Sequence, residues 1–356
     1  MKKPIYSLLM LLLFSGAFSG CEDILDIEPE EIILEEEAFE TEDDLQQFLN
    51  STYDVLANTF DGRSQALSEC LTDNLAAPRS NDDLTEVFQR NSNFFNGTIN
   101  NYYKEPYIVA FRANLLLTKF DLFPNLSETR RVQMEAEARF VRALAHFDVV
   151  RLFAQPFGFT PDNGHLGVVL ATETFDTPQP RATVRAVYNQ IIEDLQFAEN
   201  ALPETNGVYA DRNAARALLA KVYFQQNDFV NAADYAAQVI NSGRYQLGPL
   251  NRYTADPNPE SVFATVSTVD QSIGINDVRS GAYTGNYRES NAGGATLNIA
   301  ADLYAIATAD TSDQRAAFYG VTNEGQANQY FWMNKFDADW FNVPILNLTD
   351  MKLIRA

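Results

Sequence analysis

Aromatic side chains stand close to Gly and Asn residues in the second half of this sequence, where they could form a binding surface. The strongest candidates are Tyr283, Tyr287 and Trp332, with Asn286 and Arg288 nearby in the sequence. Aromatic rings stack on the apolar C–H faces of a sugar, and amide or charged groups hydrogen-bond its hydroxyl groups. We therefore predict a ligand site built from these five residues. Packing of the loops onto a helical scaffold is the alternative interpretation of each ring.

The sequence contains none of the common catalytic motifs, such as G-x-S-x-G, H-E-x-x-H or a P-loop. Its two histidines, His146 and His165, are too few to favour a histidine-based metal centre or catalytic triad. Acidic residues are so numerous that no glycosidase-type carboxylate pair stands out. Asp337 and Asp339 could form half of a calcium site, although a solvated turn is the simpler interpretation. We expect a protein that is not an enzyme and needs neither cofactor nor metal.

The first twenty residues have the pattern of a removed signal peptide. Lys2 and Lys3 precede a short apolar run, Leu8 to Phe14, and small residues lead from that run to Cys21. The run is too short to span a bilayer, which takes ~20 apolar residues. Cys21 resembles the lipidated cysteine of a bacterial lipoprotein, and this resemblance implies two or more acyl chains that hold the protein on a membrane. A plain signal peptide with an incidental cysteine is the alternative.

Acidic residues dominate the chain, and above all the segment 21–40, which we interpret as a solvated tether. The formal net charge of the 356 residues is -22. Such a protein repels phosphate backbones, so nucleic acid is not an expected partner. Cys70 is the one cysteine besides Cys21, which predicts no internal disulfide framework and a small buried apolar role for its side chain.

Helical periodicity governs much of the remaining chain. Thr41 and Ser127 are predicted to cap helices, the second of them running to about Phe153, and Thr183 is predicted to cap a third that ends near Leu202. A further helix is expected from about Tyr102 to Phe120. The stretches 61–101 and 155–180 are rich in loop-forming residues and are expected to be irregular.

The segment from Asn213 to Gly243 is predicted to be a helix–turn–helix that matches the tetratricopeptide repeat. Small residues such as Ala220, Ala232 and Ala236 fall where two helix backbones must approach closely. Gly243 suits the residue after the helix, where a positive φ is favourable for glycine. The expected fold is mainly α: tetratricopeptide-like helix pairs form a scaffold, and a long irregular region packs on it.

The order of these segments resembles the SusD/RagB family of outer-membrane nutrient-binding lipoproteins. The segments that carry the resemblance are ILDIEP, EAFETEDDLQQFLNSTYDVL, EARFVRALAHFDVVRLF, RATVRAVYNQIIEDLQFAENALP, NAARALLAKVYFQQNDFVNAADYAAQVINSGRYQL, TSDQRAAFY, WMNKF and VPILNLTDMKLIRA. They imply one SusD-like domain over 41–356, with a helical repeat core over about 102–245 and an irregular ligand-binding part over about 246–340. The ligand residues of the family follow no motif, so none is transferred to this chain.

The resemblance implies a function as well. Members are surface-exposed lipoproteins of the outer membrane that capture a nutrient, most often a glycan, and deliver it to a SusC-type TonB-dependent transporter. Binding of a peptide, or a purely protein-binding adaptor role for the tetratricopeptide pairs, are the alternatives, and a surface hydrolase is disfavoured by the missing motifs.

The C-terminal end departs from the family. Asn347, Thr349 and Asp350 stand where members more often have Arg, a small residue and Glu. The chain stops at Ala356, while residues from Ile345 onward begin an apolar helical face that has no later segment to pack against. We therefore expect either a truncated chain or a natural short version, with exposed apolar surface at this end.

Overall fold

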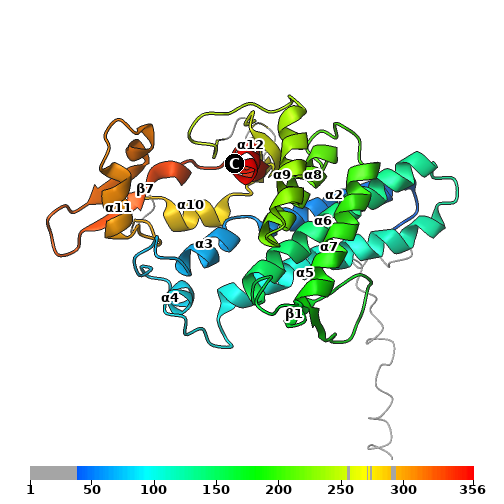
Figure 1. Cartoon of the computed structure of the whole chain (residues 1–356), viewed down its shortest axis with the longest axis horizontal. Helices are drawn as coiled ribbons and strands as arrows, with labels where there is room; N and C mark the ends of the chain where they lie inside the picture. Colours follow the sequence, from blue (N-terminus) through cyan, green and yellow to red (C-terminus); the bar gives the residue numbers. More distant parts are fainter. Residues whose placement is uncertain (1–37, 255–256, 271, 273–274, 290–293) are drawn as a thin grey trace, which may run out of the picture. The chain divides into compact units, whose positions relative to one another are not determined.

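The computed structural model describes residues 38–254, 257–270, 272, 275–289 and 294–356 (Figure 1). The predicted signal peptide, Cys21 and all but the last three residues of the predicted tether lie outside these ranges. Among the described helices, none combines the length and the apolarity that crossing a bilayer requires.

Helices make up most of the regular structure, which confirms the mainly α prediction. Their bounds are α2 Glu42–Thr59, α3 Arg63–Cys70, α4 Asp82–Phe88, α5 Gly97–Lys119, α6 Glu128–Phe153, α7 Val184–Ala201, α8 Arg212–Gln225, α9 Phe229–Asn241, α10 Gly281–Tyr287, α11 Ala301–Thr308 and α12 Leu348–Arg355. Short 3-10 turns cover Phe120–Leu122, Gln314–Phe318 and Asn334–Phe336.

The described strands are short and form two-stranded antiparallel pairs. Their bounds are β1 Leu166–Val169, β2 Arg181–Thr183, β3 Ser261–Thr265, β4 Thr268–Asp270, β5 Ile275–Asp277, β6 Tyr319–Thr322, β7 Tyr330–Met333 and β8 Val343–Asn347. The pairs are β1 with β2, β3 with β8, β4 with β5 and β6 with β7. Most of them lie in the region that was predicted to be irregular with short elements.

Side-chain caps start the scaffold helices where the sequence predicted. Ser127 Oγ accepts from the Arg130 N–H at 3.3 Å, and Thr183 Oγ1 accepts from the Ala186 N–H at 3.1 Å. These caps satisfy backbone donors that a helix cannot pair internally. In the turn between α8 and α9, Asn227 takes the left-handed conformation with φ 60°, and Asp228 caps α9.

Helices α5 to α9 lie side by side and form the scaffold (Figure 1). The α8–α9 pair buries the small side chains of Ala217, Ala220, Ala232 and Ala236 completely, and Tyr223 stacks on Tyr235 across it at a centroid distance of 5.6 Å. Gly243 follows α9 with φ 68°, as the repeat pattern predicted. The earlier helix pair, α6 and α7, is interrupted by the segment that contains β1.

A buried ion pair ties α6 to α7. Arg142 donates to both carboxylate oxygens of Asp194, with Nε–Oδ2 at 2.9 Å and Nη2–Oδ1 at 2.6 Å. The two side chains are 5% and 0% exposed. Arg142 Nη1 also donates to Asn114 Oδ1 at 2.6 Å, and Asn114 Nδ2 donates to the Ala171 carbonyl oxygen at 3.1 Å. The network therefore joins three helices and the loop after β1.

Two sequence-based expectations need correction. The stretch 61–101 is not irregular, because it holds α3, α4 and the start of α5. These helices are too short to show a clear apolar period, and burial of residues such as Leu67 and Leu84 supports them instead. The apolar surface expected at the C-terminal end is exposed only in part: Leu346 on β8, which pairs with β3, and Met351 on α12, which packs on α9, are fully buried, whereas Leu353 is 69% exposed.

Asp148 on α6 predicts a pH-dependent effect on stability. Burial raises the pKa of this carboxyl to about 6, and Arg151 and a long contact with Ser64 compensate only in part. Between pH 3.8 and about 6 the unfolded chain releases a proton that the folded chain keeps, so stability falls as pH rises through this window and stays lowered above it.

We therefore expect Asp148→Asn to raise the free energy of unfolding by about 2–3 kcal/mol at pH 7.5, and by less at pH 4.5. Urea denaturation at the two pH values measures this difference, with the exposed Asp73→Asn as the control. Equal effects at both pH values would rule out the buried charge as the cause.

Candidate functional site

A second hydrophobic core lies beside the candidate site and reaches the repeat scaffold through Tyr102 on α5 and the partly buried Leu152 and Phe153 on α6. It joins α3, α4, α10 and the segment 336–343. Tyr283 and Tyr287, both on α10, are 8% and 2% exposed inside it. Their rings pack against Phe336 with centroid distances of 5.0 and 4.9 Å. This burial corrects the prediction for these two tyrosines, because both rings are packed in a core and are almost closed to solvent.

The other three predicted residues have different surroundings. Arg288 forms ion pairs with Asp337 and Asp339, at 3.0 and 2.7 Å, so the acidic pair balances this cation. The backbone carbonyl of Asn286 accepts from the Leu297 N–H at 2.9 Å. Trp332 lies on β7 and is half-buried. The structure therefore does not bring the five predicted residues together on one surface.

Trp332 and Tyr330 share one face of the β6–β7 hairpin. In the register of this hairpin Tyr330 is opposite Thr322, and Trp332 is opposite Gly320. A Cβ atom on Gly320 would lie 2.4 Å from the indole of Trp332, so the missing side chain lets the indole lie over β6. The indole N–H donates to Thr322 Oγ1 at 3.0 Å. Both rings are thereby held on the hairpin.

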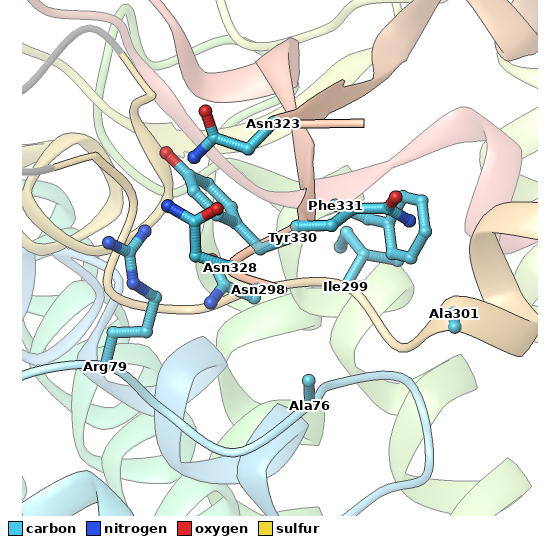
Figure 2. A pocket seen from close by; sticks show the side chains of 10 residues that line it. Ala76, Arg79, Asn298, Ile299, Ala301, Asn323, Asn328, Tyr330 and Phe331 are labelled. Carbon is cyan, nitrogen blue, oxygen red and sulfur yellow. The ribbon is translucent and has the colours of Figure 1, made fainter. Parts of the chain in front are cut away.

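A cavity of about 440 Å³ opens between this hairpin, the segment before α11 and the segment after α3. It is lined by Ala76, Arg79, Asn298, Ile299, Ala301, Asn323, Asn328, Gln329, Tyr330 and Phe331. Figure 2 shows Arg79, Asn298, Asn328 and Tyr330 gathered at one end, with Ile299, Phe331 and Ala301 toward the other. One end can therefore make hydrogen bonds while the other offers apolar contact.

Two buried polar atoms at this cavity have no hydrogen-bond partner among the described residues. They are Arg79 Nη1 and Asn298 Oδ1. Asn298 is 4% exposed, and the Arg79 guanidinium stacks over the Tyr330 ring at 4.2 Å from its centroid. A buried polar group without a partner costs roughly 1–3 kcal/mol, so such groups call for an explanation. A ligand that supplies one acceptor and one donor would satisfy both atoms.

Sequence reasoning missed most of this cavity. Tyr330 could have been found, because it is two residues from Trp332 in a strand and must share its face. Arg79 and Asn298 carry no local signal, since they are more than two hundred residues apart and only the fold brings them to one cavity.

A separate pair of aromatic rings lies exposed on the surface. Phe94 and Phe95 are 85% and 86% exposed, with ring centroids 5.5 Å apart. Asn93 Oδ1 accepts from the Phe95 N–H at 2.7 Å, which orders the turn that presents them. The neighbouring Tyr102, in contrast, is fully buried.

One larger cavity is less suited to a polar ligand. A cavity of about 550 Å³ lies along α5, but its lining is mostly apolar and includes Tyr107, Ile108 and Phe111. In the described part of the chain, no group of three or more His, Cys, Asp and Glu side chains is placed to hold a metal ion. We take the cavity beside the hairpin as the candidate site, because it lies in the part of the chain expected to bind a ligand and holds two buried polar atoms without a partner among the described residues.

Comparison with known proteins gives the family. Residues 23–224 match the model of a SusD-like family described as "Starch-binding associating with outer membrane". The chain belongs to this SusD-like family. SusD-like protein P2 of Formosa agariphila is 30% identical over 256 residues, which are 69% of this chain and 48% of that protein. SusD-like protein P38 of the same organism is 26% identical over 252 residues, or 69% and 47%. The chain thus spans about half the length of the curated relatives it matches.

Solved SusD-like structures share the fold. A SusD superfamily protein from Bacteroides thetaiotaomicron superposes with a TM-score of 0.78 at 24% identity, covering 88% of this chain and 74% of the other. A structure named "Laminarin binding SusD-like protein" superposes with a TM-score of 0.71 at 20% identity, covering 89% and 80%. These likenesses confirm the predicted SusD-like architecture of helix pairs with an irregular region packed on them.

Proposed function

We propose that this chain captures a glycan at the outer cell surface and passes it, chemically unchanged, to a SusC-type TonB-dependent transporter. The observation that carries the proposal is the cavity beside the β6–β7 hairpin. There, among the described residues, nothing hydrogen-bonds to the buried Arg79 Nη1 or Asn298 Oδ1, and the Arg79 guanidinium stacks over the Tyr330 ring. A sugar supplies the matching groups, because each hydroxyl both donates and accepts.

The composition of the cavity supports binding rather than catalysis. Its ten described lining residues include one arginine, four amide side chains and two aromatic rings, and none of them is acidic. Glycosidases in most families use a pair of carboxyl groups at the bond they cleave. The family description names starch and one similar structure is named for laminarin, and both support a glycan as the ligand.

Three further parts of the proposal rest on the sequence and the family. Cys21 is proposed to carry the lipid anchor. Trp332 is proposed to add a ring beside Tyr330, since both lie on one face of the hairpin. The repeat helices are proposed to face the transporter. The ends of α8 and α9 that flank their connecting turn support this last role. The apolar side chains of Phe224, Phe229 and Val230 there are 45%, 56% and 73% exposed.

Three measurements test the proposal. Affinity electrophoresis and calorimetry with starch, laminarin, other polysaccharides and peptides should show binding of a glycan without turnover. Palmitate labelling in cells should mark the wild-type chain and not Cys21→Ser. Cross-linking in intact outer membranes should join the protein to a transporter.

Other outcomes favour the alternatives. Turnover would indicate a hydrolase, and binding of peptides alone would change the ligand class. No ligand across the panel, together with a cross-linked protein partner, would favour an adaptor.

A further inference from the structure

Glu289 lies just outside the cavity and hydrogen-bonds to Tyr330, an aromatic residue that lines it. Its Oε1 accepts from the Tyr330 hydroxyl at 2.6 Å and from Thr322 Oγ1 at 2.8 Å. Its Oε2 accepts from the Ala295 N–H at 3.3 Å. Glu289 is half-buried and does not itself line the cavity. One carboxylate therefore binds both strands of the hairpin and the segment that leads to Asn298.

The same contacts extend to the second ring. Thr322 donates to Glu289 and accepts from the Trp332 indole N–H at 3.0 Å. Tyr330 is held at its hydroxyl by Glu289 and across its ring by the Arg79 guanidinium at 4.2 Å. Charged acceptors make the stronger hydrogen bonds in proteins, so the carboxylate suits this role.

Gly294 marks the point where these groups converge. Its φ is +79°, and a Cβ atom there would lie 2.7 Å from the Tyr330 hydroxyl oxygen, 3.2 Å from Arg79 Nη1 and 3.2 Å from Glu289 Oε2. The backbone thus comes close to all three side chains, which leaves little room for them to rearrange.

We propose that Glu289 is the positioning residue of the glycan site. It orients Tyr330 directly and Trp332 through Thr322, so that both rings stand ready before the ligand arrives. This inference rests on the proposed function for its effect on affinity, while the positions of the two rings can be measured without any ligand. Preorganisation of this kind strengthens binding because fewer side chains lose freedom on association.

The test compares Glu289→Ala, Glu289→Gln and the control Glu324→Ala, which removes an exposed carboxylate from the hairpin turn. Starch and laminarin are the probes. If the wild type binds either one, Glu289→Ala should weaken that binding about tenfold, the loss expected from one charged hydrogen bond. Glu289→Gln should restore most of it, because the amide oxygen can still accept from both hydroxyl groups. Glu324→Ala should have no effect.

A double-mutant cycle separates positioning from general stability. If Glu289 acts through Tyr330, then Glu289→Ala should weaken binding much less when Tyr330→Phe has already removed the hydroxyl. A loss of thermal stability with unchanged affinity, or equal losses of affinity in both backgrounds, would overturn the proposal.

A ligand-free measurement decides the case in which neither probe binds. In a Trp340→Phe background the tryptophan fluorescence, excited selectively at a wavelength that tyrosine does not absorb, comes from Trp332 alone. Glu289→Ala should then shift its emission and increase its quenching by acrylamide, with Glu289→Gln close to the wild type. An unchanged Trp332 signal would overturn the positioning role. Failure of the probes to bind, with the fluorescence shift present, would count against the proposed function only.

Discussion

Replacing Asp194 with alanine is expected to lower the free energy of unfolding by about 3–5 kcal/mol, the largest effect on stability that we predict. The substitution leaves the Arg142 guanidinium buried and without its bidentate partner, because that side chain is 5% exposed and both Asp194 oxygens accept from it. We expect the loop after β1 to be destabilised as well. Arg142 also donates a hydrogen bond to Asn114, and Asn114 donates one to the Ala171 carbonyl oxygen in that loop. Urea denaturation monitored by circular dichroism measures the change.

Glu128→Ala is the matched control for this prediction. It removes a carboxylate from an Arg131 pair at 2.6 Å on the surface of α6, where Glu128 is 71% exposed. Exposed pairs contribute ~0–1 kcal/mol, so this variant should stay close to the wild type. If Asp194→Ala and Glu128→Ala lower the free energy of unfolding equally, the buried Arg142–Asp194 pair contributes no more to stability than an exposed pair, and the prediction is wrong.

Arg79→Ala is expected to weaken binding of the glycan by about 10- to 100-fold, the largest effect on function that we predict. It removes the buried donor Nη1 and the cation that stacks over Tyr330. Arg79→Lys should recover little, because an ammonium group keeps the charge but neither the planar stack nor the fork of donors. Calorimetry with whichever glycan the wild type binds measures these affinities.

Arg315→Ala serves as the control for Arg79. Its side chain is 72% exposed and pairs with Asp313 at 2.6 Å, so its loss should leave the affinity unchanged. Comparable affinity of Arg79→Ala and the wild type would show that the glycan binds elsewhere, with the exposed Phe94 and Phe95 as the next place to look.

The helical scaffold was predictable from the sequence because its signals are local. Ser127 and Thr183 accept from backbone N–H groups three residues later, and such contacts need only the neighbouring chain. The alanines of α8 and α9 and the positive φ of Gly243 likewise follow from repeat spacing. His146 on α6 is buried, and its Nε2 accepts from the Ala171 N–H at 3.1 Å, a contact with a distant loop that no local signal predicts.

The aromatic residues of the second half show where such reasoning ends. Tyr283, Tyr287 and Trp332 look alike in sequence, each with Gly or Asn nearby. The first two fall on the face of α10 that packs against Phe336, while Trp332 falls on the polar face of the hairpin. Which face of α10 or of the hairpin packs against the core depends on elements from distant parts of the chain. The residues next to each aromatic in the sequence do not reveal those contacts.

The sequence by itself determined the helix pairs, their caps and the family, because these depend on spacing along one stretch of chain. Only the tertiary structure decided the site, since Arg79, Asn298 and Tyr330 meet at one cavity only after the second core has formed beside them. A binding surface depends on which side chains the core leaves uncovered, and that follows from long-range packing rather than from local pattern.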